Sequence, residues 1–362
     1  MYKINFQKPI HIHFIGIGGI SMSGLAEILL EEGFTVSGSD AKESPLTKKL
    51  ESEGAVIHYG QCAENITDDI NCVVYTAAIN KSNPELMEAV GKKIPMLTRA
   101  ELLGQLMKNY DTPIAVSGTH GKTTTTSMIS EVLLAADMDP TISVGGILKT
   151  IGGNIRVGKS GNFITEACEY TNSFLHFYPK ISVILNIEED HLDFFKDLED
   201  IRHSFHQFSA LLPSDGTLII NGDIKDYQEI YEGLDCNVIT YGSSAEFDYS
   251  ATEIQYDEKG FVSFELLKHN TSCGRVQLSV TGDHNVSNAL AAIATAELLG
   301  IPMDTIRKGL LSFSGTDRRF EYKGTFNGVT VVDDYAHHPT EIAATLKAAQ
   351  HYPHNEIWCV FQ

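Results

Sequence analysis

Short apolar segments run into glycine-rich turns, and then into helical patterns, at two places in this sequence. The first place reads HIHFIGIGGISMSG over residues 11–24, and the second reads PIAVSGTHGKTTTT over residues 113–126. Such a turn brings backbone N–H groups together at the N-terminus of the following helix, where phosphate groups bind. Repeated alternation of strands and helices also favours a parallel sheet covered by helices. We therefore expect an α/β fold with two phosphate-binding turns.

Predicted strands and helices divide the 362 residues into three units. Residues 1–107 predict a Rossmann-like parallel-sheet domain, and residues 108–321 predict a central α/β domain of the P-loop ATPase type. Residues 322–362 predict a strand, a helix over residues 339–350 and a second strand over residues 357–361. Because a usual domain has ~100 residues or more, we expect this last unit to be the first βαβ of an incomplete, C-terminal Rossmann-like domain.

The balance of charged residues restricts which partners the chain can have. Lys and Arg number 27 against 47 Asp and Glu, which gives a formal net charge of −20, and there is no long run of Lys and Arg. We therefore expect neither nucleic acid nor a membrane surface as a partner. The six cysteines are scattered without a C-x-x-C pair, and no stretch reaches the ~18 apolar residues of a membrane span. These features indicate a cytoplasmic protein and leave its oligomeric state open.

The first glycine-rich turn is compatible with two kinds of ligand. Its glycines resemble the pyrophosphate-binding turn of NAD-dependent dehydrogenases, and Asp40 follows Gly18 at about the 20-residue spacing of an acid that binds a ribose. Ser21 stands where that fingerprint has its last glycine. The turn therefore indicates a pyrophosphate, without deciding between a dinucleotide and another nucleotide-linked substrate.

Residues 118–124 form the second turn, which we call the ATP loop. It has the glycines, the lysine and the hydroxyl of a phosphate-binding loop, although Val116 stands in place of the first glycine of the strict pattern. Lys122 is placed to reach the β- and γ-phosphates, and the Thr123 hydroxyl is placed to ligate Mg²⁺. We expect the following residues to bind ATP: Gly118, Thr119, His120, Gly121, Lys122, Thr123 and Thr124.

The segment GTHGKTTTT resembles the ATP loop of the Mur ligases, which form amide bonds in the synthesis of peptidoglycan precursors. Further segments match family blocks in the same order: YTAAINKSNPEL, EACEYTNSFL, NIEEDHLDFF, GDHNVSNALAA, DRRFE and DDYAHHPTEI. The resemblance covers essentially the whole chain. Together with the first turn, FIGIGGISMSGLA, it narrows to the members that join L-alanine to UDP-N-acetylmuramate in the cytoplasm.

This resemblance implies a two-step reaction with ATP, UDP-N-acetylmuramate and L-alanine as substrates. The γ-phosphoryl group of ATP moves to the lactyl carboxylate of UDP-N-acetylmuramate, and the amine of L-alanine then displaces phosphate from the acyl phosphate. Because the first step joins two anions, neutralisation of charge dominates the catalysis. The resemblance assigns catalytic roles to Lys122, His191 and Arg319.

The same resemblance implies which residues hold the metal and the ligands. Thr123, Glu169 and His191 would hold Mg²⁺. Glu166 lies three residues before Glu169 and is the less favoured alternative. Further contacts with ATP are implied for Asn285, Arg319 and Asp334. Contacts with the UDP-linked substrate are implied for Gly16, Gly18, Gly19, Ser21, Asp40, Ala77 and Tyr335.

The family pattern continues beyond residue 362 with residues that hold the alanine carboxylate. We therefore expect this chain to bind UDP-N-acetylmuramate and ATP but to ligate L-alanine poorly or not at all. Three other functions stay open: a recycling ligase that adds a preformed tripeptide to UDP-N-acetylmuramate, an NAD-dependent oxidoreductase, and a non-catalytic nucleotide-binding regulator. Comparison of L-alanine with a tripeptide as acceptor identifies the recycling ligase. Tight binding of NADH would indicate the oxidoreductase, and magnesium-dependent ATP turnover would argue against the regulator.

Overall fold

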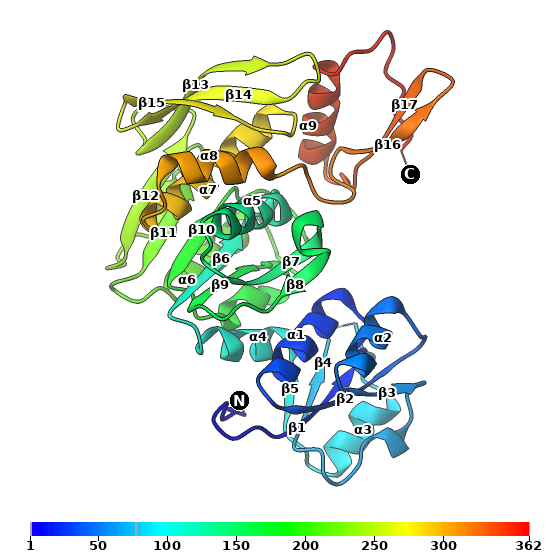
Figure 1. Cartoon of the computed structure of the whole chain (residues 1–362). Coiled ribbons are helices and arrows are strands. Elements are labelled where there is room, and N and C mark those ends of the chain that lie inside the picture. Colours follow the sequence, from blue (N-terminus) through cyan, green and yellow to red (C-terminus); the bar gives the residue numbers. More distant parts are fainter. Residues whose placement is uncertain (1, 77, 362) are drawn as a thin grey trace.

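The structure is a computed structural model that describes residues 2–76 and 78–361. Three sheets follow one another along the described chain, from an N-terminal sheet through a large central sheet to a two-stranded C-terminal sheet (Figure 1). The α/β class expected from the alternation of strands and helices is confirmed. Within these residues, no helix combines the length and the apolar character needed to cross a membrane.

The N-terminal sheet is parallel throughout and has the strand order β3-β2-β1-β4-β5. Its central strand β1 is buried at its last four residues, as expected of a strand covered on both faces. Ser44 and Asn83 cap helices α2 and α3, and the proline after each cap fixes where the helix begins. The elements are β1 (His11–Ile15), α1 (Ile20–Glu31), β2 (Thr35–Asp40), α2 (Pro45–Ser52), β3 (Val56–Tyr59), η1 (Ala63–Asn65), β4 (Cys72–Tyr75), α3 (Pro84–Gly91), β5 (Met96–Thr98) and α4 (Arg99–Met107).

The central sheet has the strand order β15-β14-β13-β12-β11-β10-β6-β9-β7-β8. Its middle strands are parallel, whereas β13, β14 and β15 form an antiparallel meander at one edge and β8 runs antiparallel to β7 at the other. The strands are β6 (Thr112–Ser117), β7 (Thr141–Leu148), β8 (Gly153–Arg156), β9 (Asn162–Glu166), β10 (Ile181–Ile184), β11 (Thr217–Asn221), β12 (Asn237–Gly242), β13 (Tyr249–Tyr256), β14 (Val262–Lys268) and β15 (Thr271–Gln277).

Helix α5 begins in the ATP loop and packs against α7 and α8 on the central sheet. Its buried face reflects this position between strands and two further helices. The helices of this part are α5 (Lys122–Ala135), η2 (Lys149–Ile151), η3 (Tyr170–His176), α6 (Leu198–Ser209), η4 (Tyr227–Ile230), α7 (Asp283–Leu298) and α8 (Met303–Ser312).

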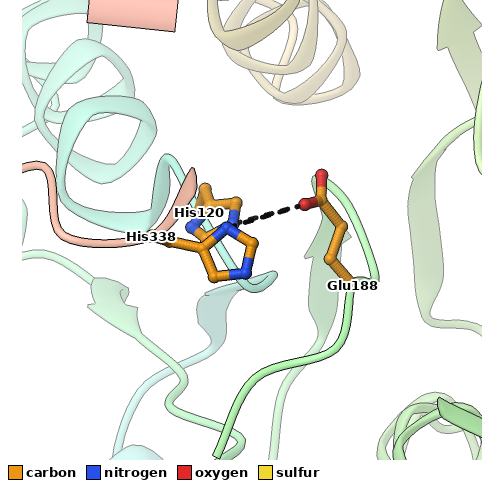
Figure 2. Close-up of side chains that lie close together, drawn as sticks. All are labelled: His120, Glu188 and His338. Carbon is orange, nitrogen blue, oxygen red and sulfur yellow. Dashed lines mark ion pairs between the residues drawn. The ribbon is translucent and has the colours of Figure 1, made fainter. Parts of the chain in front are cut away.

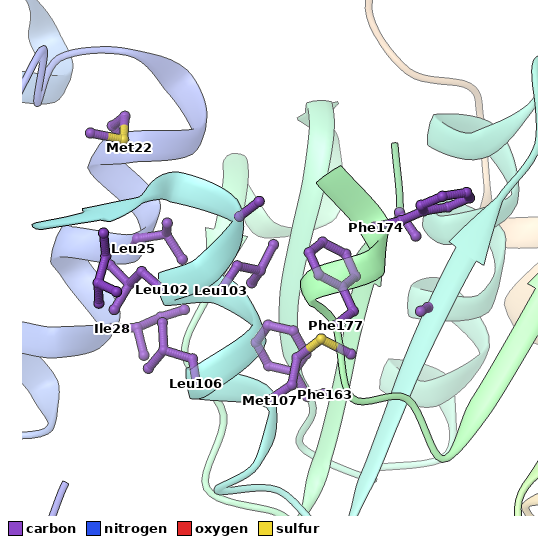
Figure 3. Close-up of a cluster of buried hydrophobic side chains, with 14 of the residues drawn as sticks. Met22, Leu25, Ile28, Leu102, Leu103, Leu106, Met107, Phe163, Phe174 and Phe177 are labelled. Atoms are coloured by element: carbon purple, nitrogen blue, oxygen red, sulfur yellow. The ribbon is translucent and has the colours of Figure 1, made fainter. Parts of the chain in front are cut away.

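Helix α4 joins the N-terminal and central sheets through one continuous buried cluster. Figure 3 shows its apolar side chains between α1 on one side and the aromatic residues of the central part on the other. The helix packs very closely there, because a Cβ added at Gly104 would lie 1.9 Å from the carbonyl oxygen of His176. This packing fixes the first glycine-rich turn relative to the central sheet. The labelled residues are Met22, Leu25, Ile28, Leu102, Leu103, Leu106, Met107, Phe163, Phe174 and Phe177.

The C-terminal unit differs from the expected βαβ. The expected helix forms as α9 (Pro339–Gln350), and the expected first strand forms as β17 (Val329–Asp333). However, β17 pairs with β16 (Glu321–Phe326) in an antiparallel hairpin, and both residues of its Asn327-Gly328 turn have positive φ.

The expected second strand over residues 357–361 is wrong. These residues have no regular structure and are exposed, with Val360 98% accessible. A strand is stable only when a neighbour satisfies its backbone groups, and among the described residues no strand pairs with this segment. The expected unit boundaries at residues 107 and 321 stay predictions.

Candidate active site

The ATP loop lies between β6 and α5, at the carboxyl end of a strand in the middle of the central sheet. Gly118 and Gly121 have φ values of 146° and 82°, a backbone region that other residues rarely adopt. A Cβ added at Gly118 would lie 3.0 Å from Leu185 Cβ, and one added at Gly121 would lie 2.8 Å from Asn288 Oδ1. The two glycines therefore allow the loop to pass close to its neighbours and reach the N-terminus of α5.

A cavity of about 700 Å³ opens beside the ATP loop. Its volume lies in the ~300–1,000 Å³ range of small-molecule sites. The walls come from the loop, the start of α7 and the C-terminal unit. Most of the residues predicted to bind ATP line it: His120, Gly121, Thr123, Thr124, Asn285, Arg319 and Asp334. The lining does not include three other described residues of the loop, Gly118, Thr119 and Lys122.

Lys122 is turned toward Glu169 in this structure. Its Nζ lies 2.9 Å from Glu169 Oε2 and also donates to the carbonyl oxygens of Gly118 and Thr119. Burial alone would lower the pKa of Lys122, but the charge of Glu169, the hydrogen bond to it and the other acidic groups nearby together outweigh burial and raise the pKa. The lysine is therefore charged, and it neutralises a carboxylate that is itself buried.

The residues predicted to hold metal form two groups. Thr123 Oγ1 donates to Glu166 Oε2 at 3.1 Å, whereas His191 Nε2 lies 4.0 Å from Glu169 Oε1. Glu166 also accepts a hydrogen bond from the N–H of Gly145, and burial raises the pKa of its carboxyl group. The carboxylates of Glu166 and Glu169 and a hydroxyl at a phosphate-binding loop fit the oxygen preference of Mg²⁺. Both carboxylates lie beside the loop, so the choice of Glu169 over Glu166 stays a prediction.

His191 is held in an unusual conformation next to this pair. Its φ is 53°, in the left-handed region, and its ring lies 4.5 Å from the ring of Tyr170. The Tyr170 hydroxyl in turn donates to Asp193 at 2.8 Å. A non-glycine residue in this region is kept there only when its surroundings define it, which is common at functional sites.

Arg319, Asp334 and Tyr335 come from the C-terminal part of the chain. Arg319 Nη1 lies 3.4 Å from Glu341 Oε1. Burial alone would raise the pKa of Glu341, but hydrogen bonding from His120 and the charge of Arg319 lower it to about 2. Asp334 accepts two backbone N–H groups and lines the cavity. Tyr335, which the structure describes, is 58% exposed and does not line the cavity.

The first glycine-rich turn lies outside the lining of this cavity. Gly18 N–H donates to Asp40 Oδ2 at 2.8 Å, so the acid predicted from spacing contacts the turn directly. The carbonyl of Ile20, at the start of α1, accepts a hydrogen bond from Asn154 of β8 at 3.0 Å. The turn therefore faces the central domain. The other described residues predicted here are Gly16, Gly19 and Ser21. Ala77 lies outside the described residues.

Sequence reasoning missed Glu188, His338 and Glu341. His120 lies among them, with Nε2 3.5 Å from Glu188 Oε2, Nδ1 3.3 Å from Glu341 Oε1, and its ring 4.4 Å from that of His338 (Figure 2). These positions belong to separate elements far apart in the sequence, so local spacing carries no signal for their meeting. The segments NIEEDHLDFF and DDYAHHPTEI contain them, but do not reveal their contacts.

Comparison with known proteins covers the same three parts of the chain. Residues 11–111 match the catalytic domain of the Mur ligase family, residues 116–296 the Mur ligase middle domain, and residues 318–362 the glutamate ligase domain of Mur ligases. A UDP-N-acetylmuramate–L-alanine ligase of Agathobacter rectalis is 63% identical over 362 residues, covering 100% of this chain and 79% of the relative. The enzyme of the same name from Clostridium botulinum (strain Kyoto) is 56% identical over 356 residues, covering 98% and 77%.

Two solved structures share the fold. The UDP-N-acetylmuramate–alanine ligase of Thermotoga maritima has a TM-score of 0.82 and 30% identity, covering 94% of this chain and 78% of that one. The UDP-N-acetylmuramate:L-alanyl-γ-D-glutamyl-meso-diaminopimelate ligase of Neisseria meningitidis has a TM-score of 0.78 and 31% identity, covering 86% and 100%. The similarity therefore extends across the N-terminal sheet, the ATP loop and the C-terminal unit.

Proposed function

The chain belongs to the Mur ligase family, and we propose that it joins L-alanine to the lactyl carboxylate of UDP-N-acetylmuramate with ATP as the driving substrate. One observation carries this proposal: identity of 63% to an L-alanine-adding relative over the full length of the chain. The ATP loop supports it, because a charged lysine, a hydroxyl and the carboxylates of Glu166 and Glu169 lie together there, and Thr123 also lines the cavity.

The reaction needs activation because a carboxylate does not react with an amine at neutral pH. In the first step a carboxylate oxygen of UDP-N-acetylmuramate attacks the γ-phosphorus of ATP, and the bond to the β-phosphate oxygen breaks to release ADP. In the second step the amine of L-alanine attacks the acyl carbon and loses a proton, and inorganic phosphate leaves as the amide forms. Repulsion between anions is the main obstacle to the first step, so positive charge in the cavity is the main catalytic requirement.

Lys122 and Arg319 supply that charge from two sides. Lys122 is held by Glu169, and the phosphate oxygens of ATP would compete with this carboxylate for the ammonium group. Arg319 lines the cavity from the C-terminal side. A charged group that is already oriented needs no reorganisation when charge develops on the transferred phosphoryl group.

Thr123, Glu169 and His191 would hold Mg²⁺, with Glu166, which accepts a hydrogen bond from Thr123, as the alternative carboxylate. A bound ion supplies neutralisation of phosphate charge. Glu169 is almost fully buried, which strengthens the interaction of its carboxylate with any cation.

Both nucleotide substrates have proposed places. Asn285, at the start of α7, and Asp334 would contact the adenosine part of ATP from the cavity wall. The first turn would hold the pyrophosphate of the UDP-linked substrate through Gly16, Gly18, Gly19 and Ser21, with Asp40 behind it. Ala77 and Tyr335 are further proposed substrate contacts. Described cysteines are free thiols, as in a reducing compartment, and we place the reaction in the cytoplasm.

A tripeptide-adding ligase is the second candidate, favoured by the likeness to the Neisseria meningitidis structure. Incubation of the chain with ATP, UDP-N-acetylmuramate and hydroxylamine tests the first step, because hydroxylamine intercepts an acyl phosphate as a hydroxamate. We expect hydroxamate formation that requires UDP-N-acetylmuramate and is lost in Lys122→Ala but kept in Lys196→Ala, whose side chain is on the surface. ADP formation without a hydroxamate would contradict the proposal. Addition of L-alanine or the tripeptide in place of hydroxylamine then separates the two candidates by the mass of the product.

A further inference from the structure

Three side chains that could bind a metal gather where the ATP loop meets the C-terminal unit. His120 comes from the ATP loop, Glu188 from the segment after β10, and His338 from the residue that caps α9. One ligand atom of each lies within 4.8 Å of the others. Figure 2 shows both rings and the carboxylate turned toward a common point.

The hydrogen bonds of His338 define which of its nitrogens carries the proton. Nε2 lies 3.1 Å from the carbonyl oxygen of Glu189, which can only accept a hydrogen bond. The proton of the neutral ring is therefore on Nε2, and Nδ1 accepts only a long hydrogen bond of 3.3 Å from the Thr340 N–H. This Nδ1 lies 3.9 Å from Glu188 Oε2.

His120 is oriented in the same way by a different acceptor. Its Nδ1 lies 3.3 Å from Glu341 Oε1, an oxygen that accepts hydrogen bonds. The proton of the neutral ring therefore belongs on Nδ1. The other nitrogen, Nε2, is buried, has no hydrogen-bond partner in the described structure, and lies 3.5 Å from Glu188 Oε2.

When both rings are neutral, two imidazole nitrogens without protons thus face one carboxylate. All three side chains are partly buried, and groups of this kind repel one another there unless a proton or a cation joins them. The spacing suits a tetrahedral ion, since ligand bonds of about 2.0–2.1 Å place neighbouring ligand atoms about 3.3 Å apart. The separations of 3.5 and 3.9 Å from Glu188 Oε2 need a small contraction, and all three ligand atoms lie within 4.8 Å of one another.

We propose that His120, Glu188 and His338 form a binding site for a divalent transition metal ion of the zinc class. The groups behind the ligands fit this role. Glu341 and the Glu189 carbonyl orient the two rings, and the Thr340 hydroxyl donates to Glu188 Oε2 at 2.7 Å. Acceptors and donors of this kind typically fix the ligands of a metal site. The ion would replace a long hydrogen bond of 3.3 Å from Thr340 N–H to His338 Nδ1.

This site is distinct from the one proposed for Mg²⁺. Its ligand set has two imidazole nitrogens and one oxygen, which suits zinc-class ions, whereas Thr123, Glu166 and Glu169 offer oxygen. Its ligands also come from both the central domain and the C-terminal unit. A bound ion would therefore tie the ATP loop to the start of α9 and restrain movement of that unit.

Titration of the nucleotide-free chain with Co²⁺ in excess Mg²⁺ tests the proposal, because four-coordinate Co²⁺ absorbs far more strongly in the visible than six-coordinate Co²⁺. We expect one equivalent of strongly absorbing Co²⁺ that Zn²⁺ displaces. His338→Ala and Glu188→Gln should each weaken Co²⁺ binding at least about tenfold, whereas the neighbouring His337→Ala should leave it unchanged. Far-UV circular dichroism identifies any variant that fails to fold, and Glu188→Gln keeps the shape of the side chain.

Two results would overturn the proposal. One is Co²⁺ binding of equal affinity in the unaltered chain, His338→Ala and Glu188→Gln. The other is a weak, six-coordinate spectrum in the unaltered chain at saturating Co²⁺. Neither result bears on the ligase activity, since the titration contains no nucleotide or amino acid.

Discussion

The Nζ atom of Lys122 lies 2.9 Å from Oε2 of Glu169, so the lysine of the ATP loop is paired with a carboxylate from the segment after β9. Both side chains are largely buried, with 16% and 3% of their surface exposed. The positive charge of Lys122 is therefore compensated by the negative charge of Glu169. An incoming phosphate group would replace Glu169 as the partner of Lys122. Because the ammonium group is already removed from water, phosphate binding does not have to supply the free energy of its desolvation.

Removal of one member of this pair should destabilise the chain. Lys122→Met leaves Glu169 buried without its partner, and we expect the free energy of unfolding to fall by about 3 kcal/mol. Lys122→Met combined with Glu169→Gln should recover most of the loss, because no charge is then left unpaired. Urea unfolding measures both, with Lys196→Met as a surface control. A double variant no more stable than Lys122→Met would contradict the pairing.

The magnesium requirement should depend on Glu169. We expect Glu169→Gln to raise the Mg²⁺ concentration for half-maximal hydroxamate formation about tenfold or more, since a ligand to the ion is lost. Glu253→Gln, at a site 68% exposed, should leave it unchanged. If only Glu166→Gln raises the requirement, the ion belongs to Glu166 and Thr123, and our preference for Glu169 is wrong.

The first turn should tolerate no side chain at Gly18. An added Cβ would lie 2.8 Å from Asp40 Oδ2, so Gly18→Ala should displace the carboxylate that braces the turn. We expect the affinity for UDP-N-acetylmuramate to fall roughly tenfold, about the effect of one lost hydrogen bond to a charged group. Isothermal titration calorimetry measures it. Gly91→Ala is the control, because no described residue lies close to a Cβ added at Gly91. An equal loss of affinity for UDP-N-acetylmuramate in both variants would contradict a role of the first turn in binding it.

The junction between the N-terminal and central sheets should depend on Gly104. A helix normally gains up to about 1 kcal/mol from Gly→Ala. At Gly104 the new methyl group would overlap the His176 carbonyl, so we expect a net loss of about 1–3 kcal/mol. Thermal unfolding of Gly104→Ala beside Gly91→Ala measures the difference. Stabilisation by Gly104→Ala would show that α4 and η3 pack less closely than the structure indicates.

Local features of the sequence predicted most of the fold. Apolar strands, the Ser44-Pro45 and Asn83-Pro84 caps and the glycines at turns act over a few residues, so their structural effect can be read directly. The ATP loop was predicted for the same reason. The strand expected over residues 357–361 was wrong because an apolar run forms a strand only beside a partner.

Contacts between distant elements could not be predicted. The meeting of His120 with Glu188 and Glu341 depends on how the C-terminal unit packs against the ATP loop, and no spacing in the sequence encodes that. The direction of Lys122 toward Glu169 also depends on a tertiary contact. The β16–β17 hairpin, by contrast, had a local signal in Asn327-Gly328 that was overlooked.

Calorimetric titration of the chain with UDP-N-acetylmuramate, UDP-N-acetylglucosamine and NADH tests the central claim most directly. The two UDP-sugars differ by the lactyl carboxylate on which the proposed reaction takes place. We predict that UDP-N-acetylmuramate binds at least about tenfold more tightly than UDP-N-acetylglucosamine, as expected for one charged hydrogen-bonding group, and that NADH does not bind. Equal affinity for the two UDP-sugars, or tighter binding of NADH, would contradict the account.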